Sequence, residues 1–170
     1  MAEAIEQIRV ATEVDVDNLA DLIAAFRDHL EQQRPHRAEI LGALSLLLVE
    51  ANVEFLVACT GSGVAVAYTQ VRYYYSLWST GLEAQIEDLF VLPVKRGQGL
   101  GSKLVESVVS RACAHGCQLI VLNTNERNTA ALHLYTKVGF VAERSRWQGG
   151  RQLWLEMPLS KQPNQPAAPA

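Results

Sequence analysis

The sequence predicts an α/β protein with a mixed, mostly antiparallel central sheet and flanking helices. Two observations carry this. Along the 170 residues, apolar side chains alternate between a strand-like period of two and a helical period of about three and a half. In the C-terminal half, a strand, a glycine-rich loop, a helix and another strand follow one another, as in a βαβ unit. The length suits one domain with a full core.

The N-terminal part predicts one short strand and two helices. The strand is expected at 8–11. Thr12 is a helix N-cap with Asp15 three residues later, and apolar residues at helical spacing continue to Leu30. After the break at Arg34-Pro35-His36, a second helix is expected at about 38–51.

Strands dominate the middle of the chain, where β-branched and aromatic residues gather. They are expected at 55–60, 64–75 and about 82–91. Gly61-Ser62-Gly63 is typical of the turn between the first two. Pro93 ends the third, because proline cannot donate a hydrogen bond to a sheet.

The C-terminal part follows the glycine-rich segment 96–101. It predicts a helix through 104–112, a buried strand at 119–122, a helix at 129–138, and two last strands near 141–147 and 151–157. Gly116 and Gly139 are expected to end the two helices. We expect one domain at 8–158, followed by a disordered, proline-rich tail at 159–170.

Composition excludes several classes of function. The chain has 15 Lys and Arg against 18 Asp and Glu, a net charge of −3, so it lacks the basic field of a nucleic-acid or membrane-surface binder. No apolar run is long enough to span a bilayer. The cysteines, Cys59, Cys113 and Cys117, are odd in number, which favours free thiols and a cytoplasmic location.

The glycine-rich segment is the most informative part of the sequence. It reads Arg96-Gly97-Gln98-Gly99-Leu100-Gly101-Ser102-Lys103 and joins a strand to a helix. Glycines let the backbone approach a ligand, and the first N–H groups of a helix are unpaired where the dipole favours an anion. The segment therefore predicts a phosphate or diphosphate cradle, with a simple connecting turn as the alternative.

Two familiar nucleotide loops do not fit this segment. A Walker A loop needs Gly-Lys-Ser/Thr after four intervening residues, and here Ser102 precedes Lys103. A dinucleotide fingerprint needs a third glycine where Ser102 stands, and an acid about twenty residues later is missing between Leu119 and Asn125.

Two motifs resemble the GNAT superfamily of N-acetyltransferases. Residues 96–101 match its acyl-CoA loop, Arg/Gln-x-x-Gly-x-Gly/Ala, and the segment from Asn128 to Phe140 looks like its Asn…Ala…Leu-Tyr…Gly-Phe segment. The resemblance covers about 8–157. Within the superfamily, 73–78 followed by 86–91 is similar to the diamine (spermidine/spermine-type) N-acetyltransferases.

The resemblance implies acetyl-CoA as co-substrate and a homodimer. It implies that the Val91 N–H polarises the thioester carbonyl and that Asn128 contacts the acyl-CoA arm. The full set expected to bind the cofactor is Leu89, Phe90, Val91, Arg96, Gly97, Gln98, Gly99, Leu100, Gly101, Ser102 and Asn128.

Acetyl transfer to an amine needs a base, since an alkylammonium has a pKa of about 10. Strand alternation predicts Glu87 on one face with Leu89 and Val91, and Asp88 on the other with Phe90. Glu87 is the expected base, as the resemblance also implies. Asp88 is the alternative, or binds a cationic substrate. A solvent-exposed strand carboxylate is the plain alternative for Glu87.

Tyr135 is the expected acid for the departing thiolate. It follows Asn128 by two helical turns, so both side chains can face one side, and a phenol carries its proton at neutral pH. The alternative is a core tyrosine. Cys113, His115 and Cys117 form a Cys-x-His-x-Cys pattern, but no fourth ligand is evident and we expect no metal.

The acceptor is expected to be a small primary amine. Tyr75 and Trp78, with Asp88, are the expected substrate-binding residues, because aromatic rings hold ammonium groups by cation–π contact. Ordinary cross-strand aromatics or a subunit interface are the alternatives. Ser76 and Leu77 replace an acid of the diamine enzymes, and the following loop is one residue longer, so an amino acid or analogue fits as well as a polyamine.

Three other functions stay open at this level. The acceptor can be a protein N-terminus or lysine, for which an open groove would be expected. The fold can hold acyl-CoA without catalysis. A nucleotide-binding α/β protein is the third, and it would bind NAD or ATP in place of CoA.

Overall fold

The computed structural model describes residues 5–142, 155 and 157. The elements are β1 (Ile5–Val10), α1 (Val16–His29), α2 (Arg37–Leu47), β2 (Val53–Thr60), β3 (Ala65–Ser76), β4 (Gly81–Val91), α3 (Leu100–Ala114), β5 (Leu119–Leu122) and α4 (Thr129–Val138). Short 3₁₀ turns lie at Glu13–Asp15 and Pro93–Lys95. All of them belong to the unit that ends at Phe140.

The five strands form one mixed sheet in the order β1-β2-β3-β4-β5. The first four pair antiparallel, and β5 pairs parallel to β4 after the crossover through α3. Parallel neighbours need such a crossover, usually a helix. The predicted α/β class, the mostly antiparallel sheet and its flanking helices are confirmed.

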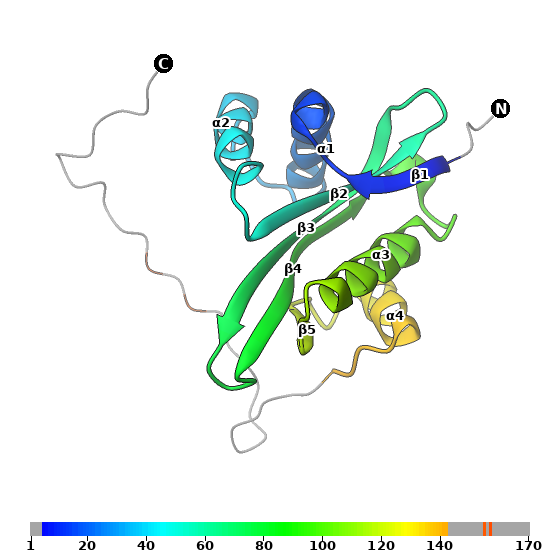
Figure 1. Ribbon diagram of the computed structural model, residues 1–170. Helices are drawn as coiled ribbons and strands as arrows, with labels where there is room; N and C mark the ends of the chain where they lie inside the picture. The colour runs from blue at the N-terminus through cyan, green and yellow to red at the C-terminus, as the bar shows by residue number, and fades with distance from the viewer. Residues whose placement is uncertain (1–4, 143–154, 156, 158–170) are drawn as a thin grey trace. The chain divides into compact units, whose positions relative to one another are not determined.

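Helices cover both faces of the sheet, α1 and α2 on one and α3 and α4 on the other (Figure 1). Each face has its own apolar core. Side chains of α1 and α2 pack with Phe55, Tyr68 and Phe90. Those of α3 and α4 pack with Val71 and Ile86. Successive strand residues point to opposite faces, which is why neighbours in sequence serve different cores.

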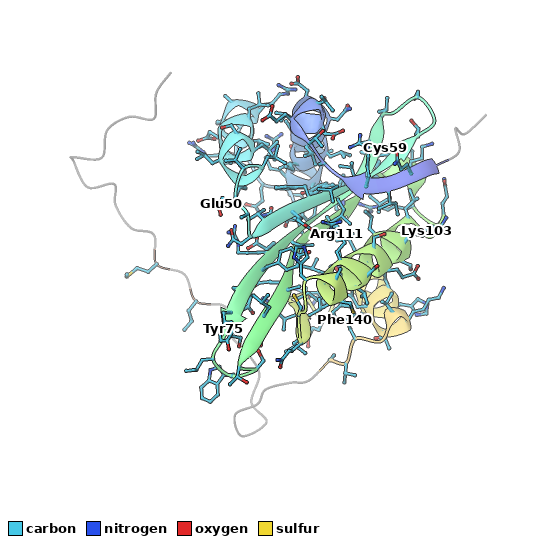
Figure 2. All side chains as sticks on the ribbon, in the orientation of Figure 1. Glu50, Cys59, Tyr75, Lys103, Arg111 and Phe140 are labelled. Carbon is cyan, nitrogen blue, oxygen red and sulfur yellow. The ribbon has the colours of Figure 1, made fainter. Side chains whose placement is uncertain are left out.

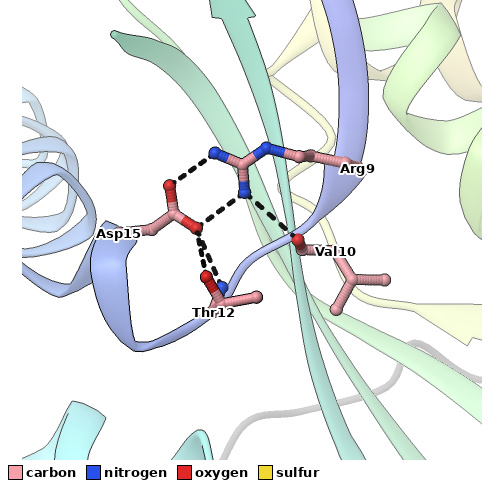
Figure 3. Close-up of polar contacts among 4 residues, drawn as sticks. All are labelled: Arg9, Val10, Thr12 and Asp15. Carbon is pink, nitrogen blue, oxygen red and sulfur yellow. Dashed lines mark hydrogen bonds and ion pairs between the residues drawn. The ribbon is translucent and has the colours of Figure 1, made fainter. Parts of the chain in front are cut away.

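A half-buried ion pair ties β1 to the start of α1 (Figure 3). Arg9 donates Nη1 and Nη2 to the two Asp15 carboxylate oxygens, both at 2.7 Å. Asp15 is 2% exposed and also accepts from the Thr12 N–H at 2.8 Å. The predicted Thr12–Asp15 cap is therefore present. The Arg9 guanidinium lowers the pKa of the Asp15 carboxyl.

A second polar cluster fixes α3 against the sheet. Glu54 of β2 accepts from Nε and Nη2 of Arg111 and from the Tyr73 hydroxyl at 2.9 Å. His115 Nε2 lies 3.1 Å from the same carboxylate. These bonds lower the pKa of Glu54 from 4.5 to about 2, and those from Arg111 contribute most. Figure 2 labels Arg111 on the face of α3 that meets the sheet.

The predicted bounds hold to within a few residues for most elements. Those of β5 and α4 coincide with the structure at 119–122 and 129–138. The third helix, by contrast, begins at Leu100, directly after the glycines. The strands predicted near 141–147 and 151–157, and the tail predicted at 159–170, lie mostly or wholly outside the described residues. Within those residues, no helix is long and apolar enough to cross a membrane.

Candidate active site

A cleft of about 430 Å³ opens where β4 and β5 diverge. Their ladder pairs Glu83–Ile86 with Leu119–Leu122 and stops there, although β4 continues to Val91. Residues 86–91 of β4 form one wall, and Asn123 and Thr124, just beyond β5, line the cleft as well. The remaining lining comes from the end of α1, the loop before α3, and α4.

Two amide groups of β4 face this opening. Hydrogen-bonded and non-bonded pairs alternate along an antiparallel ladder. The Leu92 N–H donates to the Val66 carbonyl, so Leu92 and Val66 form a hydrogen-bonded pair. Val91 opposite Ala67, and Leu89 opposite Thr69, are then non-hydrogen-bonded pairs. The N–H groups of Leu89 and Val91 therefore turn away from β3, toward the side where β5 has diverged.

The glycine-rich loop presents its backbone N–H groups at the N-terminus of α3. Gly97 and Gly99 have φ of +76° and +75°, a conformation that glycine adopts without steric cost. Counting from Gly97 into α3, the first backbone N–H that donates a hydrogen bond is that of Lys103, which donates to the Gly99 carbonyl. The N–H groups of residues 97–102 have no hydrogen-bond partner in the described part of the chain. Such an array at a positive helix end favours an anion.

Close packing explains the third glycine. A Cβ at Gly101 would come within 2.5 Å of the Leu134 side chain on α4, whereas a Cβ at Gly97 or Gly99 would meet nothing within 4 Å. Gly101 thus lets α3 approach α4, and the first two glycines leave the space above the loop open. Residues 97–99 are exposed, so their N–H groups are accessible to a ligand.

A β-bulge in β4 alters the predicted alternation. Gln70 pairs with Asp88 and Val71 with Ile86, so Glu87 is an extra residue opposite no partner. Thr69 Oγ1 donates to the Asp88 carbonyl at 2.7 Å beside the bulge. Glu87 therefore shares the α1 face with Asp88. Its predicted place on the face of Leu89 and Val91 is wrong, because alternation assumes an uninterrupted ladder.

The two neighbouring carboxylates have different surroundings. Glu87 lies at the exposed edge of the cleft and accepts from Gln70 Nε2 and from Arg72 Nε, the latter at 2.9 Å. Arg72 also lies 3.5 Å from Glu50, so Glu87 is part of a surface ion-pair network.

Asp88 is more deeply placed. The Tyr68 hydroxyl donates to its Oδ2 at 3.4 Å. Tyr68 is 0% exposed. Burial raises the pKa of Asp88, and the negative charge of Glu87 raises it further against the opposing Tyr68 bond. Burial likewise raises the pKa of the Tyr68 phenol.

Tyr135 and Asn128 reach the cleft from α4. Tyr135 is buried, packs edge-on against Phe140 with ring centroids 5.6 Å apart, and lines the cleft. Burial raises the pKa of its phenol, and the Asp88 charge raises it further. Asn128 caps α4 by accepting from the Ala131 N–H at 3.2 Å, and it also lines the cleft.

Phe90 is the centre of a cluster that the sequence did not reveal. Its ring stacks on Phe26 with centroids 5.2 Å apart and lies 6.1 Å from the His29 ring. The Arg96 guanidinium carbon lies 5.7 Å from the Phe90 centroid, and Arg96 Nε donates to the Val91 carbonyl at 3.0 Å. All five residues line the cleft. His29, although exposed, belongs to this wall.

Three predicted site residues lie elsewhere. Tyr75 and Trp78 are at the tip of the β3–β4 hairpin, 70% and 87% exposed, and do not line the cleft (Figure 2 labels Tyr75). Register explains their absence, since Tyr75 pairs with Leu82, near the opposite end of β4 from Phe90. Gln98 does not line the cleft either.

The Cys-x-His-x-Cys pattern is not gathered into a metal site. His115 contacts Glu54, and its tilted ring packs against Tyr73 with centroids 4.4 Å apart, while Cys113, Cys117 and Cys59 are free thiols. In the described ranges 5–142, 155 and 157, no three His, Cys, Asp or Glu side chains group as metal ligands.

Comparison with known proteins decides the family. The model of the acetyltransferase (GNAT) family matches residues 10–140, most of the chain and the whole of the site described above. The chain belongs to the GNAT acetyltransferase family. The resemblance inferred from the two motifs is thereby confirmed.

Named relatives of this GNAT protein are N-acetyltransferases. It is 36% identical over 76 residues to a thialysine N-ε-acetyltransferase of Mus musculus, 45% of this chain and only 44% of that enzyme's length. It is 28% identical to an aminoalkylphosphonate N-acetyltransferase of Salmonella typhimurium, over 83% of this chain and 88% of that enzyme. An aminoglycoside N-acetyltransferase solved with CoA shares the fold, with a TM-score of 0.76 at 17% identity over 94% of this chain and 98% of that one.

The GNAT family uses acetyl-CoA, and the residues present fit it. The unbonded amides of residues 97–102 suit a diphosphate, and the outward N–H groups of Leu89 and Val91 suit a chain of amides laid along the diverging edge of β4. Asn128 and Tyr135 stand beside that path on α4.

Proposed function

We propose that this protein transfers an acetyl group from acetyl-CoA directly to a primary amine of a small molecule. One observation carries the proposal: an open array of unbonded amides, residues 97–102, leads into a cleft that also holds the Asp88 carboxylate and the Tyr135 phenol. An anion-binding loop, a base and an acid thus meet in one space of about 430 Å³.

The cofactor residues have distinct tasks in this proposal. Gly97, Gln98, Gly99, Leu100, Gly101 and Ser102 hold the diphosphate through their N–H groups. Leu89, Phe90 and Val91 guide the thioester, and the Val91 N–H stabilises negative charge on its oxygen. Asn128, oriented by its bond to Ala131, contacts the acyl-CoA arm.

We assign the base to Asp88 rather than Glu87. Arg72 and Gln70 hold the Glu87 carboxylate at the rim. Asp88 is half-buried, and its raised pKa brings it closer to that of an ammonium. Neighbouring carboxylates in unequal surroundings divide their roles in this way. Glu87 would then supply negative charge that draws the acceptor ammonium toward the cleft.

The transfer balances as follows. The ammonium loses one proton to Asp88, and the neutral nitrogen attacks the thioester carbon. A C–N bond forms, the C–S bond breaks, and the nitrogen loses its second proton to solvent. Acetyl-CoA supplies the acetyl group, and CoA leaves as a thiol with a proton from Tyr135, whose raised pKa keeps it protonated at neutral pH. Tyr135 then takes a proton back from solvent and Asp88 releases its proton to solvent, so both residues return to their starting states.

The acceptor, assembly and location are part of the proposal. The thialysine and aminoalkylphosphonate enzymes support a small amine, with a polyamine, an amino acid or an analogue as candidates. Three free thiols support a reducing, cytoplasmic compartment. A homodimer follows the family resemblance, and the exposed Tyr75 and Trp78 suit an interface better than a substrate site.

The first experiment measures thiol release from acetyl-CoA with a panel of amines, diamines and amino acids. Amine-dependent release supports the proposal. Thermal stabilisation by CoA without turnover of any amine, including a lysine peptide, identifies a non-catalytic binding module instead. Turnover of the peptide alone identifies a protein acetyltransferase. Protection by NAD or ATP but not CoA contradicts the cofactor assignment.

Two matched variants separate the carboxylates. Asp88→Asn should lower kcat by about 100-fold or more, the range for losing a general base. Glu87→Gln should mainly raise KM for the amine. At high pH, where the amine is already neutral, Asp88→Asn should recover part of its rate. The reverse pattern, with Glu87→Gln the slower enzyme, would restore Glu87 as the base.

A further inference from the structure

The Arg96 side chain lies on the opposite side of β4 from the helix that its loop begins. The diphosphate cradle is at the N-terminus of α3, which packs on the sheet face of Val71 and Ile86. The Arg96 guanidinium instead lies over Phe90, whose ring belongs to the core facing α1. Its position therefore associates this cation with the wall of the cleft near α1.

Arg96 has hydrogen-bonding capacity to spare. Nε donates to the Val91 carbonyl and fixes the guanidinium plane. Nη1 and Nη2 make no hydrogen bond to any part of the chain that the structure describes. A guanidinium with two free donors recognises carboxylate and phosphonate groups in bidentate fashion. His29 stands on the same Phe90 ring and adds a further donor.

The same face of the cleft carries charge of the other sign. Asp88 and Phe90 are two residues apart on one strand, so their side chains emerge on one side about 7 Å from each other. A ligand lying along β4 here meets a carboxylate first and a guanidinium next. A polyamine, which is positive at every nitrogen, would bring like charge to Arg96.

We propose that the acceptor is an amine that also carries an anionic group, a carboxylate or a phosphonate, and that the Arg96 side chain holds that group. This rests on the proposed N-acetyltransferase function and narrows its substrate. The amides of the loop keep the diphosphate, while the Arg96 guanidinium serves the acceptor. Asp88 receives the ammonium end.

Paired acceptors that differ only in the anion test this. Lysine is compared with 1,5-diaminopentane, and 2-aminoethylphosphonate with ethylamine, using thiol release at saturating acetyl-CoA. The wild-type protein should favour the anionic member of at least one pair by about 10-fold or more in kcat/KM, the range of a charged hydrogen bond. A preference for lysine over 1,5-diaminopentane identifies a carboxylate as the anion, and a preference for 2-aminoethylphosphonate over ethylamine identifies a phosphonate.

Arg96→Gln tests whether the Arg96 side chain causes this preference for the anionic acceptor. It should reduce that preference by about 10-fold or more, with KM for acetyl-CoA unchanged. Arg37→Gln is the control, because Arg37 forms surface ion pairs with Asp17 and Asp21 outside the cleft. It should keep the wild-type preference.

Three results overturn the inference. Equal rates for both members of each pair overturn it while leaving the proposed function standing. The inference is also overturned, with the proposed function left standing, if Arg96→Gln raises KM for acetyl-CoA without reducing the acceptor preference. That result would show that the Arg96 guanidinium binds the diphosphate. Absence of turnover with every amine overturns the inference and the proposed function together.

Discussion

Replacing Glu54 by glutamine tests how α3, and with it the diphosphate cradle, is held to the sheet. Glu54 binds Arg111, Tyr73 and His115 at the end of α3 away from the glycine loop. A pKa lowered from 4.5 to about 2 corresponds to about 3 kcal/mol. Arg111 and His115 are 37% and 40% exposed, so solvent screening reduces the expected loss to ~1–2 kcal/mol.

The pH dependence gives the sign of this effect. Because folding lowers the pKa of Glu54, its contribution is complete above the unfolded value of 4.5 and is lost as the pH falls through about 2. Glu54→Gln should therefore unfold at lower urea concentration than wild type at pH 7, and the difference in free energy of unfolding should shrink between pH 5 and pH 2.

Urea titrations at four or five pH values measure that difference. Glu106→Gln is the matched control, an exposed glutamate on the same helix, and it should follow wild type throughout. A gap between Glu54→Gln and wild type that stays constant down to pH 2 would refute the reasoning, since it would show that the carboxylate charge contributes nothing.

Three further predictions concern the loop, the ion pair of β1 and the acid. Gly99→Ala and Gly63→Ala both place alanine at positive φ in open space, and each should cost about 1 kcal/mol in urea unfolding. Only Gly99→Ala should raise KM for acetyl-CoA, and an equal rise in both would contradict the cradle. Asp15→Asn leaves Arg9 without its carboxylate and should lower the free energy of unfolding by ~2–3 kcal/mol at pH 7, whereas an unchanged urea midpoint would mean that the pair is energetically neutral. Tyr135→Phe should lower kcat by ~10–100-fold with little change in stability, and an unaltered kcat would remove Tyr135 as the acid.

Local signals in the sequence were enough to predict the helix ends and the conformation of the glycine loop. Thr12 and Asp15 do form the predicted cap, and Gly139 ends α4 with φ of +114° as expected of a helix-stopping glycine. Gly97 and Gly99 adopt the positive φ that a ligand-facing turn requires. In each case the interactions lie within a few residues of one another.

The remaining features depend on contacts that no local pattern encodes. The bulge at Glu87 arises from pairing with β3, so alternation along β4 alone placed the side chain on the wrong face. His29 joins the cleft because α1 packs over Phe90, a contact between segments far apart in sequence. Tyr75 and Trp78 were expected to bind substrate, but the register places Tyr75 at the hairpin tip.

The extra residue in β4 makes the length of this strand part of the chemistry. Shortening β4 by one residue at the bulge would leave the pairing with β5 and the start of α3 in place, yet would remove one of the two acids from the α1 side. A relative that carries both acidic residues but an uninterrupted ladder would present only one of them to its acceptor. The length of β4, considered together with its two acidic residues, therefore distinguishes relatives that share the same motif but present different numbers of acids to the acceptor.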